Sequence, residues 1–286
     1  MSGGERSGGV PTVLTIAGSD SGGGAGIQAD LKAFARCGVH GTTAITSITA
    51  QSTVGVTAIH AVPPEMVLAQ VRAVLDDIGA DAVKVGMLGT LAGTLAVARA
   101  LDELPAGTPV VVDPVMVAES GAPLLDHEAR RALVEEILPR ASVLTPNLPE
   151  ARVLAGLEPS ASSSGAAGSE DAEAESLVRA VLALGPGIVV LTGGHRARAV
   201  DLLLDAAGDG RIVEIAGERH PDGAAHGSGC THAAVLAAQL ALGRTPLQAA
   251  RVARALTGEA IANGLREIGR GAGPVDVLGI AGMRSG

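Results

Sequence analysis

The chain has 286 residues and a formal net charge of −9, and it contains no basic stripe that would suit a nucleic-acid backbone. Apolar residues make up 47% of the sequence, but no apolar run is long enough to cross a bilayer, and residues 1–10 lack the apolar core of a signal peptide. The two cysteines, Cys37 and Cys230, match neither a disulfide scaffold nor a zinc site. We therefore expect a cytoplasmic protein with neither a nucleic-acid nor a membrane partner.

Short apolar runs alternate with helical patterns along the chain, which predicts βαβ units around a mainly parallel sheet. We expect a disordered tail over 1–10, one domain over 11–286, and a flexible surface loop over the polar, low-complexity stretch 158–175. The expected strands are 13–17, 42–50, 82–85, 110–112, 142–144, 188–191, 199–204 and 211–215, with 56–62 as a small β flap. The expected helices are 25–37, 64–77, 90–104, 126–138, 176–184, 229–241 and 246–263.

Glycines and polar residues gather directly after the expected parallel strands. The segments concerned are Gly18–Gly26, Gly86-Met87, Asp113-Pro114, Thr145–Glu150 and Thr192–His195. Ligands of open α/β sheets bind beyond the carboxyl ends of the strands, so this pattern predicts one binding cleft along that edge. A ligand ring in this cleft would lie against aliphatic or Met side chains, because Phe34 is the only aromatic residue in the chain.

Each of these segments also has a purely structural interpretation. The loop Gly18–Gly26 lacks both the Lys-Ser/Thr of a Walker loop and the dinucleotide glycine spacing, so it is either a tight turn or a close backbone approach to a ligand. Asp113 could simply end a strand before proline. Asn147 and Glu150 could cap the start of a helix.

The segment from His226 to His232 (HGSGCTH) precedes an Ala/Leu-rich helix. The N–H groups of Gly227, Gly229 and Cys230 would then point into the cleft, where a helix start attracts anions. We expect the same field to lower the pKa of the Cys230 thiol, which could act as general base toward a substrate hydroxyl while the amides stabilise the transferring phosphoryl group. The alternative is a buried, inert cysteine that packs the helix start.

The motifs, taken together, resemble those of bacterial hydroxymethylpyrimidine/phosphomethylpyrimidine kinases of thiamine biosynthesis. The matching segments run in family order from residue 13 to about 280. They are Ala17–Leu31, Ala50-Gln51 before Gly55-Val56, Val85–Leu88, Asp113–Met116, Thr145–Ala151, Gly193–His195 and His226–Thr231.

This resemblance implies a three-layer α/β/α ribokinase-like fold, ATP with Mg²⁺, and a homodimer. It implies that Gln51 binds the aminopyrimidine edge and that Cys230 is the general base, assisted by Gly227 and Gly229. The residues expected to line the ring pocket are Gly18, Asp20, Ala25, Asp30, Met87 and Val115. Asn147, Glu150, Thr192 and Ser228 are expected to bind ATP, and Asp113 and Glu150 to hold the metal.

The sequence departs from the family pattern at several of these positions. Thr192 stands where a lysine commonly precedes Gly-Gly-His, and Ala224-Ala225 replace a usual Asn-Thr. Ser52 and His232 also differ from the common residues. Neither remaining lysine is expected to replace the missing cation, because Lys32 lies in the first helix and Lys84 in a strand. By analogy with the loss of one transition-state donor, this lowers turnover by about 10²–10³.

The leading hypothesis is therefore phosphorylation of 4-amino-5-hydroxymethyl-2-methylpyrimidine and of its monophosphate. The nearest alternative is a pyridoxal or pyridoxine kinase, since those vitamers carry a similar ring hydroxymethyl group. A third hypothesis is a non-catalytic pyrimidine sensor, which Thr192 and Ala225 keep open.

Overall fold

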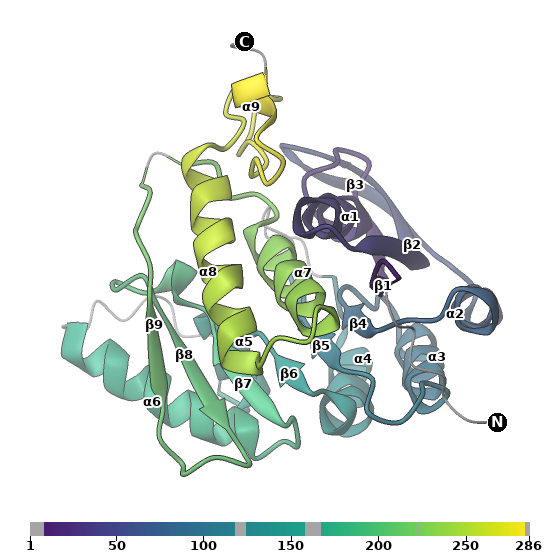
Figure 1. The fold of residues 1–286 in the computed structure, drawn as a ribbon, viewed down its shortest axis with the longest axis horizontal. Coiled ribbons are helices and arrows are strands. Elements are labelled where there is room, and N and C mark those ends of the chain that lie inside the picture. Colours follow the sequence, from purple (N-terminus) through teal and green to yellow (C-terminus); the bar gives the residue numbers. More distant parts are fainter. Residues whose placement is uncertain (1–8, 118–123, 158–166, 222, 284–286) are drawn as a thin grey trace.

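The computed structural model describes residues 9–117, 124–157, 167–221 and 223–283. Of the predicted tail 1–10, only the last two residues lie within this part. The described chain forms a nine-stranded sheet in the order β3-β2-β1-β4-β5-β6-β7-β8-β9 (Figure 1). The strands are β1 Thr12–Ser19, β2 His40–Ser52, β3 Gly55–Ala61, β4 Ala82–Val85, β5 Val110–Val112, β6 Val143–Leu144, β7 Ile188–Leu191, β8 Val200–Asp205 and β9 Val213–Ala216.

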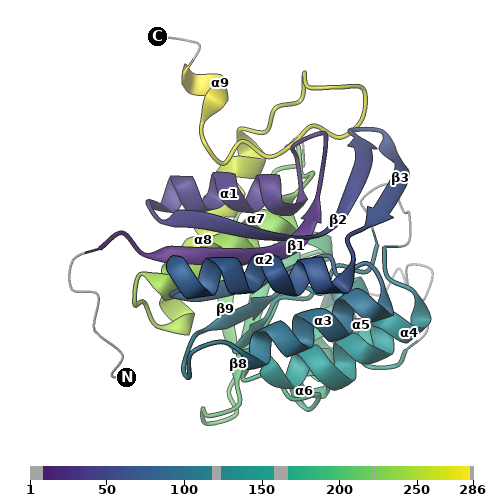
Figure 2. The same ribbon diagram turned by 90° about the vertical axis from the view of Figure 1, so that its right-hand side faces the viewer.

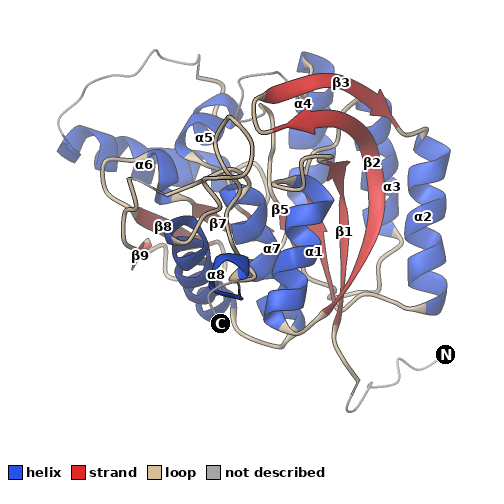
Figure 3. Ribbon diagram, turned by 90° about the horizontal axis from the view of Figure 1, so that it is seen from above, coloured by secondary structure: helices blue, strands red, loops and turns tan. Residues whose placement is uncertain are grey.

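The centre of the sheet is parallel and its two edges are antiparallel. Strands β2, β1, β4, β5, β6 and β7 pair in parallel, whereas β3, β8 and β9 each run antiparallel to a neighbour. The strands β1 and β4 are almost completely buried, as expected for parallel strands that are covered on both faces. The long hairpin β2–β3 curves away from this centre and forms the predicted flap (Figure 3).

Helices cover both faces of the sheet and make a three-layer α/β/α arrangement (Figures 1 and 2). One apolar core joins the sheet to α2–α6, and a second core joins its other face to α1, α7 and α8. The helices are α1 Gly26–Cys37, α2 Pro64–Asp77, α3 Leu91–Asp102, α4 His127–Ala132, α5 Leu148–Leu154, α6 Ala167–Leu182, α7 Ser228–Ala241, α8 Pro246–Ala262 and α9 Ile280–Met283. No helix in the described ranges is long and apolar enough to span a membrane.

The structure corrects two sequence predictions. Helix α6 begins at Ala167, so the prediction of a loop over 158–175 is wrong for residues 167–175, while 158–166 lie outside the described residues. The Ala- and Glu-rich composition of 167–175 favours a helix, and this preference prevails over its polarity. The predicted helix 126–138 is α-helical only at its start and continues as a π-turn over Leu133–Ile137 and a 3₁₀ turn over Leu138–Arg140.

Candidate active site

A cleft of about 620 Å³ lies along the carboxyl edge of the parallel strands. Its lining comes from the ends of β1, β4, β5, β6 and β7, from the tip of the β2–β3 hairpin and from the start of α7. Thirteen of the residues singled out in the sequence reach this cleft: Gly18, Asp20, Ala25, Gln51, Met87, Val115, Asp113, Asn147, Glu150, Thr192, Gly227, Ser228 and Gly229. Cys230 lines it as well. The parallel order of the strands therefore collects these residues in one place, and their individual roles remain predictions.

The glycine-rich loop after β1 is organised around the carboxylate of Asp20. One oxygen of Asp20 accepts the N–H of Gly22 at 2.8 Å, and the other accepts the N–H groups of Gly24 and Ala25 at 3.0 and 2.8 Å. His226 Nε2 lies 3.1 Å from the same carboxylate. Burial alone would raise the pKa of Asp20, but the contacts with His226 and the loop amides outweigh it and lower the pKa. Asp20 therefore stays charged, and its oxygens are engaged by the loop.

The start of α7 requires glycine at position 227. Gly227 precedes the helix with φ +82°, and a Cβ atom on it would lie 1.7 Å from the carbonyl oxygen of Gly24. A side chain here would combine an unfavourable backbone conformation with a collision against the glycine-rich loop. The absence of a side chain thus allows α7 and the loop to meet at the cleft. By contrast, Gly229 faces open space.

Cys230 is the third residue of α7 and lines the cleft, but its ionisation is not as predicted. Burial raises the pKa of the thiol to about 12; Lys84 opposes this effect, whereas the carboxylates of Asp113 and Asp30 add to it. The expectation of a lowered pKa is therefore wrong, because the helix start competes with burial and with nearby negative charge. The backbone N–H of Gly26 acts to lower the pKa of the thiol, and the thiol acts to lower the pKa of Asp113.

A buried cation, which sequence reasoning did not place in the site, forms the floor of the cleft beside Cys230. Lys84 on β4 is 0% exposed, and its Nζ lies 3.1 Å from Asp30 and 3.9 Å from Asp113. Burial alone would lower the pKa of Lys84, but the two carboxylates raise it, so the ammonium stays charged. The sequence places Lys84 in a strand, as the structure does, but gave no reason to expect its side chain at the cleft. A lysine in an otherwise apolar strand was the available signal, since a buried charge needs partners.

Asp30 occupies a different place from the one predicted. It is not among the residues that line the cleft, because helix α1 turns its side chain beneath the floor. There the hydroxyl of Thr15 donates to Asp30 at 2.6 Å, and Lys84 donates to the same oxygen at 3.1 Å. Asp30 therefore holds the buried ammonium and does not face the cleft.

At the other end of the cleft, Asn147 and Glu150 cap α5 reciprocally. The Asn147 side chain accepts the N–H of Glu150 at 2.9 Å, and the Glu150 side chain accepts the N–H of Asn147 at 2.9 Å. The capping interpretation of the sequence is thus correct, and both residues also line the cleft. Burial, together with the negative charge of Asp113, raises the pKa of Glu150 to about 8.

Thr192 continues this end of the cleft and pairs with Asn147 in an isolated parallel bridge. The next residue, Gly193, donates its N–H to the buried carboxylate of Asp201 at 2.7 Å. Arg152 also lines the cleft, with its guanidinium held by Glu173 at 2.7 Å. This second cation was not singled out in the sequence, where it reads as one of many surface arginines.

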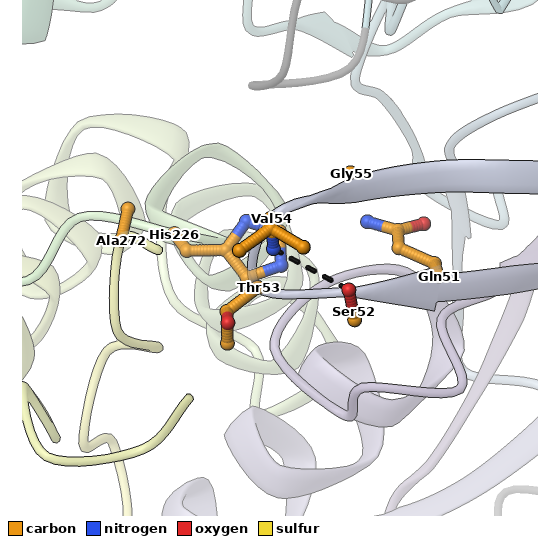
Figure 4. Close-up of a pocket in the computed structure, with 7 residues that line it drawn as sticks. All are labelled: Gln51, Ser52, Thr53, Val54, Gly55, His226 and Ala272. Atoms are coloured by element: carbon orange, nitrogen blue, oxygen red, sulfur yellow. Dashed lines mark hydrogen bonds between the residues drawn. The ribbon is translucent and has the colours of Figure 1, made fainter. Parts of the chain in front are cut away.

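A smaller cavity of about 160 Å³ adjoins the cleft and shares Gln51 and His226 with it (Figure 4). Its other lining residues are Ser52, Thr53, Val54, Gly55 and Ala272. It therefore lies between the tip of the β2–β3 hairpin and the segment that follows α8.

Comparisons with known proteins agree with this geometry. The family model for phosphomethylpyrimidine kinase matches residues 20–276. A hydroxymethylpyrimidine/phosphomethylpyrimidine kinase of Haemophilus influenzae is 42% identical over 270 residues, which cover 93% of this chain and 96% of that protein. The pyridoxal kinase of Staphylococcus aureus in complex with pyridoxal superposes with a TM-score of 0.81 at 32% identity, covering 94% of each chain. A phosphomethylpyrimidine kinase of Clostridium difficile gives a TM-score of 0.71 at 35% identity, covering 85% of this chain and 96% of that one.

The protein has a mainly parallel sheet between two helical layers, and a β flap and a helix start line the same cleft. This is the architecture of a ribokinase-like phosphotransferase. The chain belongs, within that class, to the phosphomethylpyrimidine kinase family. The fold predicted from the resemblance is therefore confirmed.

Proposed function

We propose that this protein transfers the γ-phosphoryl group of ATP to 4-amino-5-hydroxymethyl-2-methylpyrimidine, and then phosphorylates the monophosphate, as a step of thiamine biosynthesis. One observation carries the proposal: the Cys230 thiol shares a single cleft with Gln51 and Met87 and with the carboxylates of Asp113 and Glu150. The names of the relatives in the same family support the choice of substrate.

The half of the cleft that contains Gln51 suits a small aminopyrimidine. The side-chain amide of Gln51 provides a donor and an acceptor for the ring edge. Met87 and Val115 provide an apolar surface for the ring, with Gly18 and Ala25 leaving room beside it. A Cβ atom at Gly18 would lie 3.0 Å from the Met87 sulfur, so a larger residue there would force Met87 to shift.

Cys230 is the proposed acceptor for the proton of the substrate hydroxyl. With its pKa raised to about 12, the thiol is mainly protonated at neutral pH in the free protein. The small thiolate fraction is correspondingly a strong base, and Lys84 below it favours that charged form. The reaction is therefore expected to accelerate with rising pH.

The phosphates of ATP are proposed to lie between the start of α7 and α5, near Asn147, Thr192 and Ser228. The amides of Gly227 and Gly229 would stabilise the transferring phosphoryl group. Because Thr192 replaces the common lysine, Lys84 and Arg152 are the cations that line the described part of this cleft.

The carboxylates of Asp113 and Glu150 fit a Mg²⁺ ion. One oxygen of Asp113 is buried without a hydrogen-bond partner. Burial raises the pKa of both carboxyl groups, and the charge of Asp113 raises that of Glu150 further, so a divalent cation between them would favour their charged forms. The described residues contain no cluster of three or more His, Cys, Asp or Glu ligands, which agrees with an ion held by one or two carboxylates and the substrate phosphates. Held by Asp113 and Glu150, Mg²⁺ would supply positive charge that offsets the negative charge of the ATP phosphates.

Pyridoxal kinase is a second candidate function, because the superposed Staphylococcus aureus enzyme is a pyridoxal kinase in complex with pyridoxal. A non-catalytic pyrimidine sensor is a third, kept open by Thr192 and Ala225 at the cleft. We favour the pyrimidine kinase over both, since the pyrimidine kinases match at higher identity and the thiol and both carboxylates are retained. A homodimer and a location in the cytoplasm, where ATP is available, are parts of the same proposal.

A coupled assay of ADP release tests the proposal with three acceptors: the hydroxymethylpyrimidine, its monophosphate and pyridoxal. The proposal requires the pyrimidine to have a higher kcat/KM than pyridoxal. A strong preference for pyridoxal would replace it with the second candidate. Calorimetric binding of the pyrimidine without any transfer would favour the sensor.

A further inference from the structure

The segment that follows α8 crosses the substrate end of the cleft. We define residues 264–276 as the C-terminal strap, which Figure 2 shows in yellow as it runs toward the tip of the β2–β3 hairpin. The strap is anchored at its far end, where the N–H of Asp276 donates to the carbonyl of Ala260 at 2.9 Å. The carboxylate of Asp276 also caps α9 by accepting the N–H groups of Ile280 and Ala281, each at 2.8 Å.

The strap is joined to the segment that leads into α7. His226 and Pro274 form a parallel bridge, in which the N–H of Val275 donates to the carbonyl of His226 at 3.1 Å and the N–H of His226 to that of Gly273 at 3.4 Å. Because His226 also contacts Asp20, the strap is linked through this histidine to the glycine-rich loop.

The strap forms two backbone hydrogen bonds to one hydroxyl group of the hairpin tip. Thr53 Oγ1 accepts the backbone N–H groups of both Arg270 and Gly271, each at 3.2 Å. Two glycines make this approach possible. A Cβ atom on Gly269, where φ is +77°, would lie 2.1 Å from Thr53 Oγ1, and one on Gly271 would lie 1.9 Å from the carbonyl oxygen of Thr53. Any other residue at these positions would push the strap off the hairpin.

Gln51 lies at the hairpin tip that the strap contacts. In the β2–β3 register Gln51 pairs with Val56 and Ser52 with Gly55, so Thr53 lies in the turn directly beyond them. From the other side, Ser21 of the glycine-rich loop donates to the carbonyl of Gln51 at 2.6 Å and accepts its N–H at 2.8 Å. In Figure 4 Ala272 of the strap lies at the left and Gln51, Ser52 and Gly55 of the hairpin at the right, and all of them line the small cavity.

We propose that Thr53 is a positioning residue for the acceptor substrate, and that the C-terminal strap acts through its hydroxyl group to hold Gln51 in its binding position. The substrate in this inference rests on the proposed function. Without the two hydrogen bonds to Thr53 Oγ1, the tip would be held only by its strand pairing and by Ser21, and substrate affinity would fall by the cost of fixing the looser tip. The nucleotide end of the cleft has no contact with the strap among these interactions and is expected to be unaffected.

The test compares Thr53→Val with wild type. We expect the KM for the hydroxymethylpyrimidine to rise by about five- to tenfold, as loss of two neutral hydrogen bonds predicts, while kcat and the KM for ATP change less than about twofold. Thr53→Ser, which keeps the hydroxyl group, should restore the KM. The matched control is Thr57→Val on the same hairpin, whose hydroxyl donates to Ala50 at 3.0 Å away from the strap and whose loss should leave every constant unchanged.

Hydrogen–deuterium exchange of the unliganded protein provides a readout that does not depend on activity. In Thr53→Val, exchange should accelerate in the amides of Arg270 and Gly271 and in peptides covering 50–56, and Gly271→Ala should reproduce this result by displacing the strap. Unchanged exchange in both variants, or a KM for ATP that rises with that of the pyrimidine, would overturn the inference. If wild type fails to phosphorylate the pyrimidine while exchange responds as expected, the proposed function falls and the role of the strap remains.

Discussion

Replacement of Lys84 by methionine tests how the floor of the cleft is held together. The ammonium is 0% exposed and lies within 3.1 Å of Asp30 and 3.9 Å of Asp113. Lys84→Met would leave these two carboxylates buried without a cation, and removal of one partner of a buried ion pair costs about 3–5 kcal/mol. For a domain of ordinary stability this is a large part of the total free energy of unfolding.

The loss should depend on the charge that remains and on pH. Asp30→Asn added to Lys84→Met removes one of the two uncompensated charges, and the double variant should recover at least half of the loss. Burial already raises the pKa of both carboxyl groups above the ordinary value, and removal of the ammonium raises it further. The folded variant then holds protons that the unfolded chain releases, so its stability deficit should be largest at neutral pH and should shrink as the pH falls toward 5.

Urea denaturation at pH 7.5 and pH 5, followed by circular dichroism, measures these differences. A loss below about 1 kcal/mol for Lys84→Met at pH 7.5 would show that the ammonium is not needed to offset the two buried carboxylates. So would a double variant no more stable than the single one, because the deficit would then come from packing and not from uncompensated charge.

Two further predictions concern the ends of the cleft. Glu150 has a pKa raised to about 8 in the fold, against 4.5 as its ordinary value, so the folded state keeps a proton that the unfolded chain loses, and stability falls as the pH rises between these values. Glu150→Gln should therefore be more stable than wild type at pH 9 by a few kcal/mol and nearly equal to it in stability at pH 4. The KM of this variant for Mg-ATP should rise. Equal melting temperatures of the two proteins at pH 9 would contradict the predicted gain in stability. Gly227→Ala meets the Gly24 carbonyl at 1.7 Å and should cost about 2 kcal/mol or more, whereas Gly229→Ala faces open space and should cost no stability in the same denaturation experiment.

Much of the architecture could be predicted from the sequence because the parallel strands are buried on both faces. Runs such as Val110–Val112 and Ile188–Leu191 read as strands from their length and β-branched residues, and the structure has the same bounds. Once the strands are parallel, the residues that follow them must share one edge of the sheet. Gln51, Met87, Asp113, Glu150 and Cys230 could therefore be assigned to one cleft before any contact was known.

The remaining features depend on burial and on contacts between distant segments. The sequence indicates that Cys230 stands at a helix start, which lowers a thiol pKa, but not that desolvation and two carboxylates reverse the effect. Asp30 lies in an amphipathic helix, and only the packing of α1 on β1 and β4 shows that its carboxylate lies beneath the floor with Lys84. The bond from the strap to Thr53 joins residues 217 positions apart and leaves no local pattern.

The proposed mechanism depends on the Cys230 thiol taking part in phosphoryl transfer within this cleft. Its role is tested by comparing ADP release with the hydroxymethylpyrimidine for wild type and Cys230→Ala, together with calorimetric binding of the pyrimidine to both. We expect kcat to fall by about 10²–10⁴ in the variant, with pyrimidine affinity within a few-fold of wild type. Equal rates of transfer in the two proteins would contradict it.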